Sequence, residues 1–165
     1  MPVVVREMWP EDARAFLEVH HAAVRGLAAT DYPAEVILAW APLPIVDRHV
    51  EHVRRNPEGE YRIVADIDGH VVGVAVLMAA TQEVRACYVA PEASRKGVGS
   101  ALLGGIERAA RERCLALLDV DSSLTAEPFY AAHGYAVVER GEHILNGGER
   151  MACVKMRKRL TAPPS

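Results

Sequence analysis

The sequence is poor in several features that define protein classes, and each shortage excludes a class. Its 165 residues include three cysteines, Cys87, Cys114 and Cys153, which are too few and too scattered for a disulfide framework. No Cys-x-x-Cys pair is present, so we expect no metal site, and a reducing cytoplasm suits this cysteine usage. No apolar run approaches the ~20 residues that cross a membrane, and the first residues lack the basic and apolar segments of a secretory signal.

Basic residues are not in excess either. Lys and Arg number 19 against 22 Asp and Glu, for a formal net charge of −3, which argues against nucleic acid as the default partner. Acidic residues outnumber basic ones over residues 1–60, whereas bases predominate from Arg95 to Arg113. This distribution favours a cationic ligand near the first region and a polyanion near the second.

The length and composition fit one globular domain. Half of the residues are hydrophobic and a quarter are charged, as in folded proteins rather than disordered ones. A chain of this length buries one sizeable core but not two. We therefore expect a single domain over residues 1–160 and a loose tail over 161–165.

Hydrophobic spacing and turn residues predict an α+β fold, a β-rich core with helices on both faces. Strands are expected over residues 3–8, 61–67, 71–78, 83–89, 115–120, 135–142 and 151–157. Helices are expected over residues 10–27, 34–40, 45–55, 98–113 and 127–133. The apolar run 115–120 is typical of a central strand buried on both faces. Gly104 and Gly105 inside a helix indicate close packing of that helix on the sheet.

The most informative segment is the loop before the helix expected at 98–113. The preceding strand stops at Pro91, Arg95 and Lys96 follow, and Gly97-Val98-Gly99 leads directly into the helix. Two glycines let the backbone turn with its N–H groups outward, and the helix adds the positive end of its dipole. This arrangement is typical of a phosphate-binding loop. The alternative is an ordinary strand-to-helix turn with surface charges.

Two familiar phosphate loops do not fit. The dinucleotide signature needs a third glycine where this chain has Leu102, and a Walker loop needs lysine after the glycine rather than before it. The segment Ser94-Arg95-Lys96-Gly97-Val98-Gly99 instead resembles motif A of the GNAT superfamily of acetyl-CoA-dependent N-acyltransferases, which reads (Gln/Arg)-x-x-Gly-x-(Gly/Ala). Ser94 departs from that pattern at the first position, and Arg95 supplies a charge one residue later.

A second segment resembles the same superfamily. Residues 123–135 are similar to the pattern Asn-x-x-Ala-x-x-x-Tyr-x-x-x-Gly-(Phe/Tyr), with Ser123 in place of asparagine. The matching residues are Ala126, Tyr130, Gly134 and Tyr135. Two motifs in the expected order, about 30 residues apart, identify the chain as a member of the superfamily. The resemblance extends over roughly residues 60–157.

The resemblance implies a fold and a ligand. The fold is a mixed, mostly antiparallel central sheet flanked by helices on both faces and splayed between strands 4 and 5. The ligand is acetyl-CoA, whose pantetheine arm lies along the exposed strand edge, so that Cys87 is a backbone contact rather than a nucleophile. The residues expected at the CoA site are Cys87, Tyr88, Val89, Ser94, Arg95, Lys96, Gly97, Val98, Gly99, Ser100, Ser123 and Tyr130.

The chemistry implied is direct attack of an amine on the thioester in a ternary complex. Backbone N–H groups near Tyr88 and Val89 would stabilise the oxyanion. Tyr130 would protonate the departing sulfur, since a thiolate needs only a nearby proton to leave.

The base that takes the amine proton is left open by the sequence. Glu83 begins the strand that carries the thioester site, and a carboxylate there would act through water. His20 and His21 lie on the first helix, where GNAT proteins build the acceptor pocket, and His133 precedes Gly134. Bound water or bulk solvent is the remaining alternative.

The expected function is acetylation of a primary amine, of a small molecule rather than a protein. Tyr32 and Trp40 are expected to line the acceptor pocket, and a core role is the alternative for Trp40. Two alternatives stay open. One is a non-catalytic acyl-CoA-binding sensor or regulatory module, motivated by Ser94 and Ser123. The other is acetylation of a protein N-terminus or lysine, which a long open groove would favour. The resemblance also implies a possible homodimer.

Overall fold

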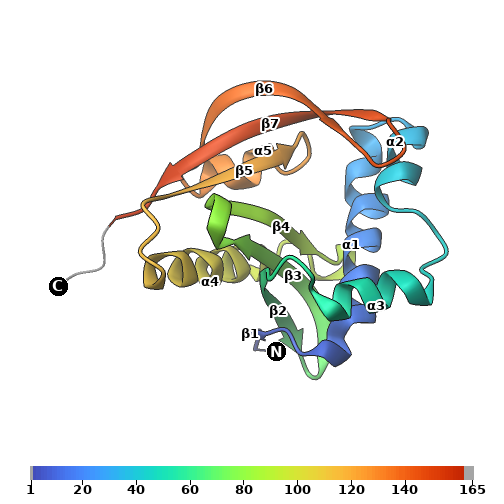
Figure 1. Ribbon diagram of the computed structural model, residues 1–165, viewed down its shortest axis with the longest axis horizontal. Helices are drawn as coiled ribbons and strands as arrows, with labels where there is room; N and C mark the ends of the chain where they lie inside the picture. The colour runs from blue at the N-terminus through green and yellow to red at the C-terminus, as the bar shows by residue number, and fades with distance from the viewer. Residues whose placement is uncertain (1, 162–165) are drawn as a thin grey trace.

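Within residues 2–161, which the computed structural model describes, seven strands form one mixed sheet in the order β1-β2-β3-β4-β5-β7-β6 (Figure 1). Their bounds are Val4–Glu7 (β1), Tyr61–Ile67 (β2), His70–Met78 (β3), Glu83–Val89 (β4), Leu117–Ser123 (β5), Ala136–Ile144 (β6) and Arg150–Arg159 (β7). Only β4 and β5 pair in parallel in this part of the chain, and the other neighbours are antiparallel. The mixed, mostly antiparallel sheet is confirmed.

Helices cover both faces of the sheet, as predicted (Figure 1). Their bounds are Ala13–Leu27 (α1), Ala34–Trp40 (α2), Asp47–Arg55 (α3), Val98–Glu112 (α4) and Glu127–Ala132 (α5). α4 packs against β2, β3 and β4 on one face, and α1 packs against β3 and β4 on the other. α5 shares the core of the α4 side through Tyr130.

α4 buries the apolar stripe that the sequence predicts, which consists of Val98, Leu102, Ile106, Ala109 and Ala110. Gly105 lies where α4 touches the sheet, because an added Cβ there would be 2.9 Å from Ile63 Cδ1. At Gly104 a Cβ would meet nothing within 4 Å. The expectation of close packing is therefore correct for Gly105 and wrong for Gly104, which faces solvent.

β5 differs from its prediction in place and in burial. It begins two residues later than expected, and its buried side chains alternate with exposed ones. Leu118, Val120 and Ser122 face the α4 core, whereas Asp119 bonds Arg157 at 2.7 Å on the opposite face. The expectation of a strand buried on both faces is wrong, because Asp119 and Asp121 alternate with the buried residues and occupy the face away from α4.

β4 and β5 diverge after a short contact. Only Glu83–Asp119 and Val84–Val120 are paired between them. A β-bulge at Arg85 shifts the register of β4 on β3, and the rest of β4 has no partner on its β5 side among the described residues. The predicted splay between strands 4 and 5 is thus confirmed, and it opens a gap in the middle of the sheet.

Two expectations concern the ends and the membrane. Of the predicted tail, Thr161 is exposed after β7, and residues 162–165 lie outside the described residues. No helix between residues 2 and 161 has the length and apolar character that a membrane span requires.

Candidate active site

The N-terminal end of α4 presents unpaired amide groups. Gly97 precedes the helix with a φ of +79°, a left-handed conformation that favours glycine. The first amide of the helical ladder belongs to Ala101, whose N–H donates to Gly97 O at 3.1 Å. The amides of Val98, Gly99 and Ser100 therefore stay outside the ladder, and no side chain among residues 2–161 caps this end. They point where the helix dipole is positive, which suits an anion.

A cleft of about 510 Å³ lies beside these amides. Gly99 permits one of its walls, because an added Cβ would be only 3.0 Å from Phe129 Cε1. Of the residues expected at the CoA site, all but Lys96 and Tyr130 line this cleft. The strand edge at Cys87–Val89 and the loop at residues 94–100 thus face one space.

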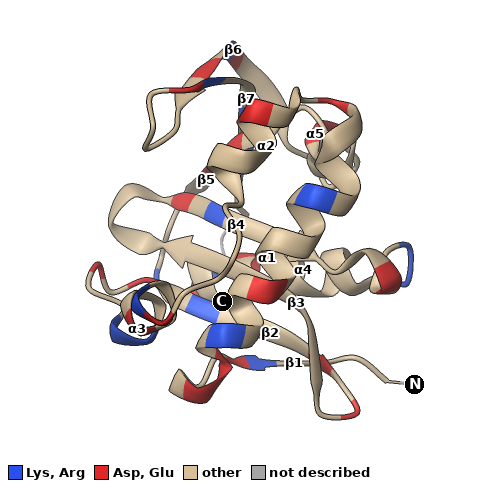
Figure 2. Ribbon diagram, turned by 90° about the vertical axis from the view of Figure 1, so that its right-hand side faces the viewer, with Lys and Arg blue, Asp and Glu red and all other residues tan. Residues whose placement is uncertain are grey.

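Ser94 and Arg95 both line the cleft at the loop before α4. The Ser94 hydroxyl donates to Pro91 O at 2.8 Å and so closes the turn before α4. Arg95 lines the cleft in a left-handed conformation, with a φ of +63°, in the basic segment that precedes α4 (Figure 2). The positive charge beside the cleft therefore comes from Arg95, at a cost in backbone strain.

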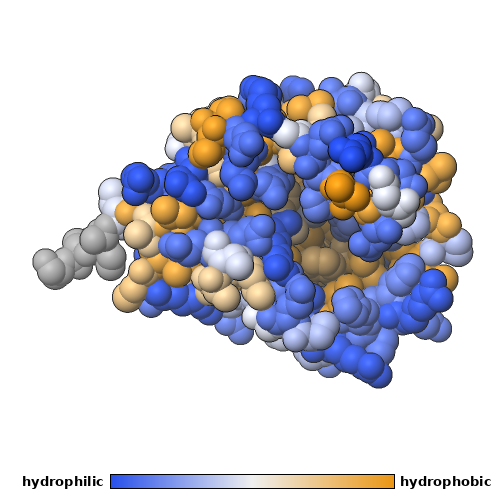
Figure 3. All heavy atoms as spheres, turned by 45° about the horizontal axis from the view of Figure 1, so that its top comes forward, coloured by the Kyte–Doolittle hydropathy of each residue, from blue (hydrophilic) through white to orange (hydrophobic). Residues whose placement is uncertain are grey.

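A second cavity, of about 560 Å³, lies on the other side of the gap. It shares with the cleft the residues Trp40, Cys87, Tyr88, Ser123 and Ala126. Figure 3 shows a hollow in the molecular surface with a largely apolar floor and a hydrophilic rim. The divergence of β4 from β5 is what connects the two spaces.

Tyr130 lines the second cavity from α5, close to the residues that both spaces share. Its side chain is 4% exposed and packs edge-on against Phe129 and Tyr135, with ring centroids 5.2 and 5.5 Å apart. Burial raises the pKa of Tyr130 well above that of an ordinary phenol. The phenol therefore keeps its proton at neutral pH.

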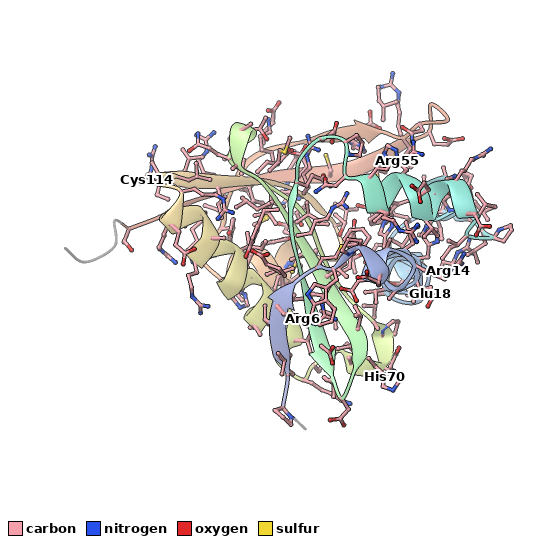
Figure 4. The ribbon with its side chains drawn as sticks, turned by 60° about the horizontal axis from the view of Figure 1, so that its bottom comes forward. Arg6, Arg14, Glu18, Arg55, His70 and Cys114 are labelled. Carbon is pink, nitrogen blue, oxygen red and sulfur yellow. The ribbon has the colours of Figure 1, made fainter. Side chains whose placement is uncertain are left out.

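The cysteines are not arranged as nucleophiles. Burial raises the pKa of Cys87 to about 12, and its Sγ lies 4.0 Å from Gly99 O. Cys153 lines the second cavity with a pKa raised by burial. Cys114 is exposed at the end of α4 opposite to the loop (Figure 4). No group of three or more potential metal ligands is found among residues 2–161.

Glu83 lines the second cavity at the point where β4 and β5 separate. One carboxylate oxygen accepts hydrogen bonds from Arg85 Nε at 3.1 Å and from Thr81 Oγ1 at 3.2 Å. The other oxygen has no such bond within the described part of the chain. It is therefore available to a ligand or to water in the cavity.

The three histidine candidates for the base lie outside both cavities. His20 is half-buried against Tyr88, with ring centroids 4.6 Å apart, and burial lowers its pKa to about 4. His21 is buried, and burial lowers its pKa as well. His133 bonds Phe129 O and Ser100 Oγ. Of the four candidates for the base, Glu83 alone lines a cavity.

Trp40 and Tyr32 have different positions. Trp40 lines both cavities, as expected for a residue of the acceptor pocket. Tyr32 is buried outside them. Its hydroxyl donates to Ala152 O at 2.5 Å and accepts from Leu124 N at 2.8 Å, which ties the segment before α2 to β7 and to the loop after β5. The expectation that Tyr32 lines the acceptor pocket is therefore wrong, because its side chain belongs to a buried core cluster.

The sequence did not identify most of the charged wall of the second cavity. Arg85 bonds Glu60 at 3.1 Å and also pairs with Glu58, and Arg62 bonds Glu60 at 2.8 Å. Asp121 lines the same wall, and no ion pair involves it within residues 2–161. These side chains come from β2, β4 and β5, so no contiguous motif marks them. Only the alternation of Asp119 and Asp121 with buried residues could have indicated a polar face.

Comparison with known proteins agrees with this geometry. A family model described as "Acetyltransferase (GNAT) domain" matches residues 28–160. The chain is 28% identical over 138 residues to YafP of Escherichia coli strain K12, described as an uncharacterized N-acetyltransferase, with 84% of each chain covered. A GCN5-related N-acetyltransferase from Rhodopseudomonas palustris matches with a TM-score of 0.88 and 29% identity over 97% of each chain. YncA from Salmonella typhimurium, solved with its cofactor acetyl-CoA, has a TM-score of 0.71 at 19% identity, covering 100% of this chain and 98% of its own.

The family model includes both motifs, at residues 94–99 and 123–135, and spans most of the chain. The fold brings the first motif to the cleft at α4 and the tyrosine of the second to the connected cavity. The protein therefore belongs to the GNAT family and is an N-acetyltransferase.

Proposed function

We propose that the protein transfers an acetyl group from acetyl-CoA to a primary amine of a small cationic molecule, by direct attack in a ternary complex. One observation carries the proposal. A cleft with free helix amides and a cavity with a buried phenol meet at the gap between β4 and β5. Two substrates entering from opposite sides would meet at the same strand edge.

The cleft fits a CoA diphosphate on structural grounds. Its floor includes the free amides of Val98, Gly99 and Ser100, and Arg95 adds a positive charge. Glycine at position 99 lets the Phe129 ring pack directly against α4, so that the ring forms one wall of the cleft. A pantetheine arm would then run along the β4 edge at Cys87–Val89, where amide groups on the β5 side have no strand partner among the described residues.

Acetyl-CoA supplies a thioester, so transfer requires a new C–N bond, a broken C–S bond, and two proton movements. Tyr130 donates its phenolic proton to the sulfur as the C–S bond breaks. Its position beside the residues that both spaces share supports this role, and the phenol carries its proton at neutral pH. A backbone amide of β4, at Tyr88 or Val89, stabilises the negative charge on the carbonyl oxygen.

Glu83 receives the proton that the amine releases, directly or through one water. Its free oxygen and its place beside the gap support this assignment. His20 is assigned to packing instead, because a pKa of about 4 makes an imidazole a weak base at neutral pH. The proton that Tyr130 loses returns from solvent after the products leave.

The charges of the second cavity favour a cationic acceptor. Three carboxylates, of Glu60, Glu83 and Asp121, line it together with the guanidinium groups of Arg62 and Arg85. Glu58 adds a fourth carboxylate, since it pairs with Arg85. Both arginines are held by glutamates, whereas Asp121 and one oxygen of Glu83 are left for the ligand. Such a wall attracts ammonium groups.

The size and covering of the cavity favour a small molecule over a protein chain. Its volume is about 560 Å³, in the range of a small-ligand pocket. Residues of the β6–β7 hairpin, His143, Leu145, Met151 and Cys153, form part of its wall. A long open groove would have favoured a protein N-terminus or lysine, whereas here the β6–β7 hairpin closes one side of the cavity.

The experiment is a coupled assay of transfer. The protein is mixed with acetyl-CoA and a panel of monoamines, diamines and short peptides, while free thiol is followed. We expect thiol release with small diamines and initial-rate patterns that intersect, as in a ternary complex. Tight CoA binding with no release for any amine would contradict the proposal and support an acyl-CoA sensor. Release only with peptides would contradict the small-molecule acceptor.

A cytoplasmic location and a homodimer remain part of the proposal. All three cysteines are free thiols, which suits a reducing compartment. β6 ends the sheet and is exposed along its whole length, with Val137 and Val138 45% and 52% exposed. A free edge that carries exposed valines supports pairing with a second copy. Light scattering on the purified protein should give the mass of a dimer, and a monomer mass at micromolar concentration would contradict it.

A further inference from the structure

His133 joins two residues of the cleft without lining it. It follows α5, and its Nδ1 lies 2.8 Å from Phe129 O. Its Nε2 lies 2.9 Å from the hydroxyl of Ser100, in the first turn of α4. Both Phe129 and Ser100 line the cleft proposed for CoA. The ring of His133 also packs against that of Phe129, with centroids 4.6 Å apart.

The hydrogen bonds fix the tautomer of the neutral ring. A carbonyl oxygen only accepts, so the proton must be on Nδ1 and is donated to Phe129 O. Nε2 then carries a lone pair, so the Ser100 hydroxyl must donate to it. In this state the Ser100 hydroxyl donates its only proton to His133 Nε2, so toward the cleft its oxygen can only accept a hydrogen bond. Phosphate oxygens also accept hydrogen bonds, so the Ser100 oxygen cannot bond a phosphate in this state.

Protonation of His133 reverses this bond. Both ring nitrogens then donate, so Nε2–H points to Ser100 Oγ and the Ser100 hydroxyl proton becomes free to turn into the cleft. The Ser100 hydroxyl then offers a donor beside the free amides of Val98 and Gly99, and the imidazolium of His133 places a positive charge next to that hydroxyl. Each of these changes strengthens the binding of an anion.

We infer that His133 controls the affinity of the cleft for the CoA diphosphate through the Ser100 hydroxyl, so that CoA binds more tightly when His133 is protonated. The inference rests on the proposed function, because it takes the cleft to be the CoA site. His133 is a positioning residue here and touches no substrate. By linkage, bound CoA must in turn favour the protonated ring, and binding is accompanied by proton uptake.

The surroundings of His133 add no competing ion pair. α4 contributes Ser100, and α5 contributes the ring and carbonyl of Phe129. From β7, the Lys158 ammonium would lie 3.7 Å from a Cβ at Gly134, but it is bound to Glu107 at 2.9 Å. No carboxylate bonds His133 within residues 2–161. The diphosphate is therefore the anion best placed to stabilise the protonated ring.

The test uses 3′-dephospho-CoA, which keeps the diphosphate and lacks the phosphate monoester that itself titrates near neutral pH. Its dissociation constant is measured by calorimetry from pH 5.5 to 8.5 for the wild type, His133→Gln and Ser100→Ala. A control variant, His70→Gln, removes an exposed histidine at the far β2–β3 turn (Figure 4). We expect the wild-type and control affinities to fall about tenfold as the pH rises.

The variants decide between outcomes. His133→Gln should show an affinity nearly independent of pH, and Ser100→Ala should show a smaller pH dependence than the wild type, because the ring charge remains while the hydroxyl is lost. Calorimetry in buffers of different ionisation enthalpy should show proton uptake for the wild type and the control but not for His133→Gln. Wild-type affinity that is independent of pH, or a pH dependence as large as that of the wild type in either variant, would overturn the inference while leaving the CoA site in place. Failure of the wild type to bind at any pH would overturn the proposed function itself. Ser100 is exposed on α4, so its alanine variant keeps the test valid should the histidine variant not fold.

Discussion

The two spaces that meet at the β4–β5 gap are built in different ways. The cleft takes most of its lining from two short stretches, residues 87–100 and 123–129, and much of its chemistry from backbone amides. The second cavity, which we propose binds the amine, is lined by residues of α1, α2, β2 to β5, α5 and the β6–β7 hairpin, and its polar groups are side chains. One space is therefore specified locally in the sequence and the other by the whole fold.

Because of this difference, we expect side-chain substitutions to change ligand binding less in the cleft than in the second cavity. Ser94 and Ser123 both depart from the family pattern, yet each still bonds the backbone beside the cleft, to Pro91 O and from Ala126 N. Backbone donors are kept whatever side chain is present. In the acceptor cavity, a single side chain such as Asp121 changes the charge of the wall. Specificity for the amine should therefore vary more readily than affinity for CoA.

The largest effect is expected where the two spaces join. Tyr130→Phe should lower kcat by about 10²- to 10³-fold and leave the KM for acetyl-CoA nearly unchanged, because the phenol acts on the departing sulfur and not on binding. Thiol release measures both parameters. Tyr135→Phe is the matched control, since its hydroxyl bonds Glu107 at 3.0 Å, away from the gap. Unchanged turnover in Tyr130→Phe would remove the acid from the mechanism.

His20, which packs against Tyr88 beside both spaces, should make the stability of the protein depend on pH. Burial lowers the pKa of His20 to about 4, from an ordinary value of 6.5. Between these values the unfolded chain binds more protons, so the free energy of unfolding should fall as the pH drops from about 6.5 to 4. The loss attributable to His20 is on the order of 2–3 kcal/mol. Urea unfolding of His20→Phe should show a smaller loss over this range, and a loss equal to that of the wild type would contradict the burial argument.

Two glycines of α4 sharpen the contrast between the cleft and the rest of the helix. Gly99→Ala places a Cβ 3.0 Å from the Phe129 ring and should weaken CoA binding about tenfold. Gly104→Ala, where a Cβ meets nothing within 4 Å, should leave binding unchanged and raise the free energy of unfolding by about 1 kcal/mol. Calorimetry and thermal unfolding measure the pair. Equal effects of both variants on binding would mean that the cleft does not hold CoA.

Arg95 combines a charge with a strained backbone, and two variants separate them. Arg95→Ala removes the charge and keeps the φ of +63° on a non-glycine residue. Arg95→Gly removes the charge and the strain, so it should be about 1 kcal/mol more stable than Arg95→Ala. Both should weaken CoA binding about threefold, and more at low salt. Equal stability of the two variants would show that the conformation of Arg95 carries no strain.

The smallest effect is expected for Asp121, in the charged wall of the second cavity. Asp121→Asn should raise the KM for a diamine about threefold at low salt, with little change for a neutral amine and none for acetyl-CoA. Glu139→Gln is the control, because Glu139 is exposed on β6 and does not line the cavity. A similar rise in both variants would indicate long-range charge rather than a contact in the cavity.

The contrast between the spaces also sets how much the sequence could predict. The strand edge, the glycine turn and Tyr130 were found because each is marked by residue types at fixed spacing along the chain. Lys96 was expected in the cleft for its charge, but it does not line the cleft, and the sequence does not show where a flexible side chain points.

The acceptor cavity was largely beyond prediction. The pairing of Arg85 with Glu58 and Glu60 joins β4 to the loop before β2, at the β-bulge formed by Arg85. Tyr32 carries a hydroxyl and lies near the acceptor side, but its two hydrogen bonds to distant backbone groups are created only by the fold. Side chains that meet across long loops leave no local pattern.

One measurement tests the central claim most directly, a crystal structure of the protein with CoA. We expect the diphosphate within hydrogen-bond distance of the amides of Val98, Gly99 and Ser100, and the sulfur in the β4–β5 gap within reach of the Tyr130 hydroxyl. A diphosphate bound away from α4, or a sulfur separated from Tyr130 by protein atoms, would contradict the account.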